Sequence, residues 1–147
     1  MKLACVTVSL LLFCGISAAQ TGKLTPGNLI SSLQKKARID SLILKTYPQA
    51  KPQTSDRGVL IAAETKFFGV DGVLSLNQST DNQFGNIKWE PEKPSFAAFN
   101  QAKRELQQYL GNPQKDPTGD LTFTNGSIAA VLSLDLEGSF TLMIYYL

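Results

Sequence analysis

The stretch LTFTNGSIAAVLSLDLEGSFTLMIYYL, residues 121–147, decides the fold class of this chain. Its apolar runs are separated by two turn signals, Asn125-Gly126 and residues 136–139. An Asn-Gly pair between apolar runs is typical of a tight antiparallel hairpin. We therefore expect three antiparallel strands here, over 121–124, 127–135 and 140–147.

The last of these strands is apolar on both faces. Since side chains alternate along a strand, Tyr145 and Tyr146 are predicted to point to opposite sides, with Met143 on the side of Tyr145. A strand that is apolar on both faces is typical of the middle of a sheet or of a sheet covered on both sides. We expect one of these two positions.

A second set of strands is predicted upstream. Residues 58–68 form a β-rich run, and the Asp71-Gly72 pair predicts a hairpin turn that returns the chain along 73–77. In residues 86–90 the apolar Ile87 and Trp89 alternate with charged side chains. This alternation predicts a third strand with the indole in the core.

Helix signals precede both sets of strands. Thr25-Pro26 supplies an N-cap and a proline at the first helical position, and Ser95 is a second N-cap before the stripe of residues 96–110. The apolar stripe of the first helix shifts after Arg38. We expect either a bend or a second short helix at that point.

The predicted order is therefore α-β-β-β-α-β-β-β, an α+β fold with an antiparallel sheet and two main helices packed on it. Two similar halves would form one continuous sheet. In architecture this order resembles small exported domains of the β-lactamase inhibitory protein type, and the resemblance implies halves built from a helix and a meander.

The first nineteen residues have the pattern of a secretory signal peptide. Lys2 precedes the apolar run 3–16, and Ser17-Ala18-Ala19 supplies small residues for cleavage. The expected product is a single exported α+β domain of residues 20–147, periplasmic or secreted. The apolar run is too short for a permanent membrane span. Lipidation at Cys14 is not expected, because bulky Phe13 precedes the cysteine.

The amino-acid composition limits which catalytic groups the domain can contain. Both cysteines, Cys5 and Cys14, lie in the signal segment, and the chain has no histidine. Thiol and imidazole catalysis is therefore excluded for residues 20–147, and we expect no cofactor and no metal site. The net charge of +2 does not call for a nucleic acid partner.

Two groups of residues could support catalysis. The carboxylate pairs Glu90 with Glu92 and Asp135 with Glu137 could serve a small hydrolase, but each lies at a strand end or turn, where acidic residues are common. Ser32 precedes Lys35 at the Ser-x-x-Lys spacing, but both are expected on a solvated helix face, where a lysine keeps its proton.

The sequence thus favours a small non-enzymatic binding or accessory protein of the cell envelope or extracellular space. Its partner would be another protein there, and the candidate binding surface consists of Tyr145, Met143, Lys35, Lys36 and Arg38. The alternatives are a carboxylate-dependent hydrolase and a carrier of a small apolar ligand. A carrier would have a cavity lined by Phe67, Phe68, Phe96 and Phe99.

Overall fold

The computed structural model of the chain describes residues 23–81 and 83–147. The predicted signal peptide 1–19, with Cys5 and Cys14, lies outside the described residues. Within the described part no helix is long and apolar enough to cross a membrane.

The described residues form three helices, of which the first and the third begin at the predicted N-caps. They are α1 (Pro26–Gln34), α2 (Ile39–Thr46) and α3 (Phe96–Leu110). The hydroxyls of Thr25 and Ser95 accept hydrogen bonds from the first turns of α1 and α3, as expected of N-cap residues. The first apolar stripe is divided into two helices, which was one of the two predicted outcomes.

All the strands belong to one antiparallel sheet. They are β1 (Gln53–Ser55), β2 (Gly58–Phe67), β3 (Val70–Gln78), β4 (Phe84–Pro91), β5 (Gln114–Lys115), β6 (Leu121–Asn125), β7 (Ile128–Leu134) and β8 (Phe140–Tyr146). Their order across the sheet is β1-β2-β3-β4-β8-β7-β6-β5. The last long strand, β8, therefore lies in the middle, as its two apolar faces predict.

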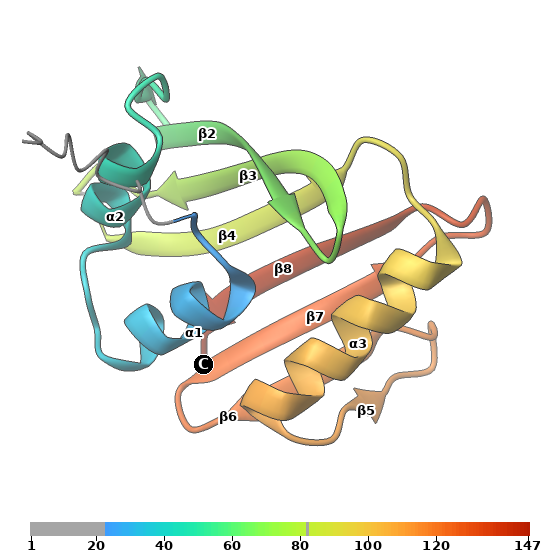
Figure 1. Cartoon of the computed structure of the whole chain (residues 1–147). Helices are drawn as coiled ribbons and strands as arrows, with labels where there is room; N and C mark the ends of the chain where they lie inside the picture. The colour runs from blue at the N-terminus through green and yellow to red at the C-terminus, as the bar shows by residue number, and fades with distance from the viewer. Residues whose placement is uncertain (1–22, 82) are drawn as a thin grey trace, which may run out of the picture.

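The sheet consists of two halves with the same plan (Figure 1). In each half, helical structure is followed by a short strand and then by a meander of three longer strands. The halves join where β4 pairs with β8, with Ile87 opposite Ile144 and Trp89 opposite Leu142. The chain is thus an α+β protein with one continuous sheet.

The predicted element order was incomplete, because it lacked the two short strands. Residues 53–55 and 114–115 lie between the predicted elements, and they pair with the outer edges of β2 and β6. Both segments consist of polar or charged residues and are exposed. Their backbone groups pair with strands already present, so they need no apolar pattern of their own.

The predicted turn at Asp71-Gly72 is wrong. Phe67 pairs with Val70, so the turn consists of Phe68 and Gly69, whose φ angles are 51° and 80°. Two positive φ angles are characteristic of a type I′ turn. Phenylalanine is unusual there, but the Phe68 ring is 4% exposed and packs against Trp89 at a centroid distance of 5.5 Å. Burial of the ring offsets the backbone cost.

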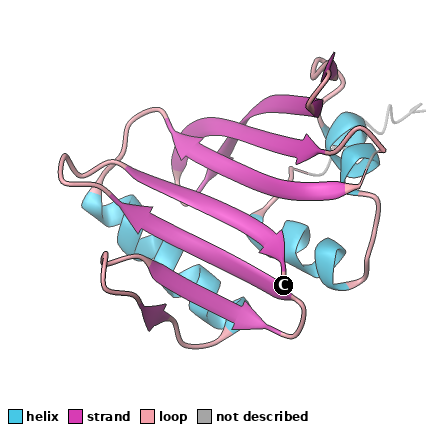
Figure 2. Ribbon diagram, turned by 180° about the vertical axis from the view of Figure 1, so that it is seen from behind, coloured by secondary structure: helices cyan, strands magenta, loops and turns pink. Residues whose placement is uncertain are grey.

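The helices lie on one side of the sheet, and the other side is open (Figure 2). On the covered side α3 contacts β6 and β7, and α1 contacts α3 and β7. The core between the sheet and the helices contains residues of both halves. The ring centroid of Trp89 lies 5.6 Å from that of Phe67 in its own half and 5.9 Å from that of Phe140 in the other half. Trp89 and Ile87 are both buried, as their alternation predicts.

Candidate functional site

We call the side of the sheet without helices the open face. Strand alternation decides which side chains belong to it, because the buried residues of each strand point toward the helices. On the second half of the sheet the open face carries only neutral side chains over the described strands β6, β7 and β8. They are Thr122, Thr124, Ala129, Val131, Ser133, Thr141, Met143 and Tyr145.

Met143 and Tyr145 lie on β8, which is the edge of this uncharged patch and a middle strand of the whole sheet. Met143 is opposite Val131 on one side and Lys88 on the other, and its side chain is 37% exposed. Tyr145 is half-buried between Ala129 and Asn86. The predicted orientation of these two residues is therefore the one observed.

The first half of the sheet places charges beside the uncharged patch. Lys88 pairs with Glu90 at 2.7 Å, and Lys66 pairs with Asp71 at 3.6 Å. Both pairs are solvent-exposed, so each contributes little to stability. Of the two, the Lys88–Glu90 pair on β4 borders the uncharged patch, whereas Lys66 and Asp71 lie farther away on β2 and β3.

The predicted basic residues do not join this patch. Lys36 and Arg38, in the connection between α1 and α2, line a cavity of about 690 Å³. Lys35 instead lines a separate depression of about 340 Å³ between α1 and α2, together with Ser31, Ser32 and other residues. The candidate surface predicted from sequence is thus divided among three places.

An ion pair orders one wall of the larger cavity. The Arg38 guanidinium donates to Asp40 Oδ2 at 2.6 Å. This hydrogen bond holds the pKa of the half-buried Asp40 carboxyl below its usual value, and it raises the pKa of Arg38. The two charges largely neutralise one another.

Aromatic side chains form another wall. Phe84 packs edge-to-face on Tyr146 with ring centroids 5.0 Å apart. The Tyr146 hydroxyl donates to the Leu33 carbonyl at 2.9 Å, which ties the end of β8 to α1, and burial raises the pKa of this phenol. No signal in the sequence links these residues to Lys36, because they come from segments far apart in the chain.

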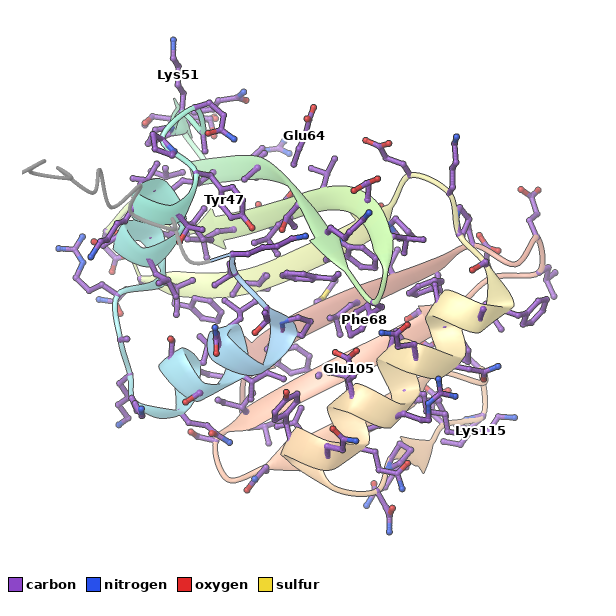
Figure 3. All side chains as sticks on the ribbon, in the orientation of Figure 1. Tyr47, Lys51, Glu64, Phe68, Glu105 and Lys115 are labelled. Carbon is purple, nitrogen blue, oxygen red and sulfur yellow. The ribbon has the colours of Figure 1, made fainter. Side chains whose placement is uncertain are left out.

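The carboxylates that could serve a hydrolase lie in separate surroundings. Glu90 pairs with Lys88, and Asp135 accepts backbone hydrogen bonds from Glu137 and Ser139 within the turn before β8. Glu92 instead lines a depression of about 440 Å³ with Glu64 and Asp71, where Lys23 and Lys66 supply positive charge. Glu64 points outward from β2 in Figure 3.

The phenylalanines considered for a carrier do not share one environment. Phe67 and Phe68 are buried, with their rings in contact with Trp89, and Phe99 packs on Phe140 at 5.7 Å. Phe96 is 67% exposed at the start of α3. Figure 3 shows Phe68 at the tip of the β2–β3 hairpin. Three of the rings are thus part of the core packing.

Comparison with protein-family models, with curated proteins and with solved structures finds no match to this chain.

Proposed function

We propose that this chain is an exported, non-enzymatic binding protein that engages another envelope or extracellular protein through the uncharged patch on β6, β7 and β8. The observation that supports this proposal is the open face itself. One face of the continuous sheet is left without helices (Figure 2). Met143 and Tyr145 belong to this face on β8, a strand in the middle of the sheet.

The composition of the patch matches that of a protein interface. Tyrosine and methionine are enriched in interfaces, whereas charged side chains are depleted at their centres and tolerated at their rims. Here Met143 and Tyr145 are uncharged residues in the middle of the sheet, and Lys88 lies directly opposite Met143 on the neighbouring strand β4.

Export is supported by the pattern of residues 1–19 and by the absence of cysteine from 20–147 in the printed sequence. N-terminal sequencing of the protein recovered outside the cytoplasm tests it. We expect Gln20 as the first residue, and recovery of exported protein that still begins at Met1 would contradict cleavage at Ala19.

Affinity capture with matched variants tests the binding surface. The full chain, Tyr145→Ala and Met143→Lys are each used to capture proteins from the extracellular or envelope fraction of the source organism. Phe96→Ala is the control, because it removes an exposed aromatic ring from the helix side of the molecule. We expect a stoichiometric partner, retained by Phe96→Ala and bound at least about tenfold more weakly by the two patch variants.

Two outcomes would contradict the proposal. One is a partner bound equally by Met143→Lys and by the unaltered chain, since a charge placed at the centre of an interface is costly. The other is loss of binding that accompanies unfolding of Tyr145→Ala, which circular dichroism would detect.

A further inference from the structure

The outer edge of β2 lacks a neighbouring strand over most of its length. Strand β2 has 10 residues, and β1 pairs only with its start, from Gly58 to Leu60. Figure 1 shows β2 at the rim of the sheet. An edge strand of this length is a template for pairing with another chain, because its backbone N–H and C=O groups are unpaired.

The register of the β2–β3 hairpin shows which backbone groups face the free edge. Phe67 and Val70 close a two-residue turn, and the closing pair of such a turn is hydrogen-bonded. Because hydrogen-bonded pairs alternate along an antiparallel ladder, every second residue back from Phe67 also bonds to β3. The residues between them direct their N–H and C=O groups outward, and beyond β1 they are Ala62, Glu64 and Lys66.

These outward groups are free to bind another strand. Within residues 23–81 and 83–147 no hydrogen bond joins them to another backbone group. The side chains of Glu64 and Lys66 are exposed. A depression of about 440 Å³ lies beside residues 64–66, and Lys23 and Tyr47 also line it.

The charges on this edge are complementary to those of a second copy of the same strand. When two β2 edges pair antiparallel with Thr65 at the two-fold axis, each Glu64 lies directly opposite the partner's Lys66. Opposite charges that face one another across two strands are favourable, and like charges are unfavourable. A register centred on Glu64 or on Lys66 would place like charges opposite one another, so the charges select the register centred on Thr65.

The same register matches the backbone groups. Glu64 and the partner's Lys66 both direct N–H and C=O outward, so they can exchange both hydrogen bonds of an antiparallel pair. The symmetry repeats this pair on the other side of Thr65. Because the two-fold axis is perpendicular to the sheet, the open faces of both copies lie on the same side.

We propose that two copies of this chain associate by antiparallel pairing of their β2 edges, centred on Thr65. The interface continues the eight-stranded sheet of one copy into that of the other. The uncharged patch on β6, β7 and β8 is not part of this interface. The inference therefore goes beyond the function proposed above and does not depend on it.

Sedimentation equilibrium of the full chain tests the proposal. We expect a reversible equilibrium in which the mass approaches that of two chains as the concentration rises from micromolar to millimolar. The mass of a single chain at millimolar concentration would overturn the proposal, and so would assembly beyond two chains.

Reversal of the charges tests the register. Glu64→Lys gives an edge with two positive charges and Lys66→Glu gives an edge with two negative charges, so each variant alone should dimerise at least about tenfold more weakly. An equimolar mixture of the two variants should dimerise as well as the unaltered chain, because a positive edge then faces a negative one. Failure of the mixture to recover dimerisation would overturn the pairing of Glu64 with Lys66.

Two variants of the open face serve as controls. Lys88→Glu reverses a charge on β4 and Met143→Lys adds one on β8, and both positions are distant from the β2 edge in the strand order. Both should leave dimerisation unchanged. Dissociation of the dimer by Met143→Lys as strongly as by Glu64→Lys would overturn the proposal, because the two copies would then meet through the open face. Circular dichroism verifies that each variant is folded.

Discussion

At the scale of single residues, Gly72 explains why the indole of Trp89 fits beneath β3. A Cβ added at Gly72 would lie 2.8 Å from Trp89 Cε2, closer than real Cβ contacts, and it would also clash with the Glu90 carbonyl. Trp89 is fully buried and contacts rings from both halves of the sheet. The glycine is therefore needed for close approach of the indole.

Gly72→Ala should lower the free energy of unfolding by about 2 kcal/mol, because the core has no room for the methyl group. Gly126→Ala is the comparison: no heavy atom lies within 4 Å of its added Cβ, and only the strain of its positive φ remains, about 1 kcal/mol. Urea denaturation of both variants measures the difference. A loss at Gly72 no larger than that at Gly126 would contradict this account of the packing.

The ion pair of Arg38 with Asp40 makes a pH-dependent contribution to stability. Its hydrogen bond lowers the pKa of Asp40 in the folded protein. The contribution is therefore present above the unfolded pKa of about 4 and is lost as the pH falls through the folded pKa.

Asp40→Asn should consequently destabilise the protein more at pH 7 than at an acid pH below the lowered pKa of Asp40, where the native carboxyl is protonated as well. Denaturation curves of both proteins at the two pH values measure this difference. The unaltered chain keeps some acid sensitivity in either case, because hydrogen bonds also lower the pKa of Asp81 and Asp116. An Asp40→Asn penalty that does not change with pH would contradict the assignment.

At the scale of elements, the helices differ in how they begin. Ser95 Oγ accepts from Ala98 N at 3.2 Å, and Thr25 caps α1 in the same way. The N-cap of α2, Arg38, makes no side-chain capping bond. Burial of Ile39 and Ile43 in the core therefore stabilises α2 more than N-terminal capping does.

Ser95→Ala should destabilise the protein by about 1 kcal/mol, because the first turn of α3 loses its acceptor. Ser95→Asp preserves an acceptor and should restore most of that loss. Thermal denaturation followed by circular dichroism measures both changes. Equal destabilisation by alanine and aspartate would show that the hydroxyl acts through some contact other than the cap.

At the scale of the whole molecule, placement of all helices on one side makes the two faces of β8 unequal. Leu142 points toward the helices and is 1% exposed, whereas its neighbour Met143 is 37% exposed on the open face. Both are apolar, so the strand pattern alone does not distinguish them. The difference arises because α1 and α3 pack against only one face of the second half of the sheet.

Leu142→Ala should therefore cost about 3 kcal/mol of stability, since it leaves a cavity in the core. Met143→Ala should cost less than about 1 kcal/mol, because it truncates an exposed side chain. Chemical denaturation of the two variants provides the comparison. Similar losses would show that the open face is covered in solution, for example by another copy of the chain.

The predictable parts of this fold carry local signals. The cap at Ser95, the alternation around Trp89 and the apolar last strand each depend on neighbouring residues, and the structure confirms them. The prediction of a turn at Asp71-Gly72 was wrong. The turn is formed by Phe68 and Gly69 instead, because this position buries the Phe68 ring. The opposite faces of Tyr145 and Tyr146 were predictable, because alternation is local as well.

By itself the sequence determined the helices and the longer strands of the two halves, because capping, periodicity and alternation are properties of short segments. Only the tertiary structure decided that β4 pairs with β8, that the helices lie on one side, and that Lys36 shares a cavity with Phe84 and Leu147. These features depend on contacts between distant segments. Burial of one shared core selects those contacts, and no local pattern encodes them.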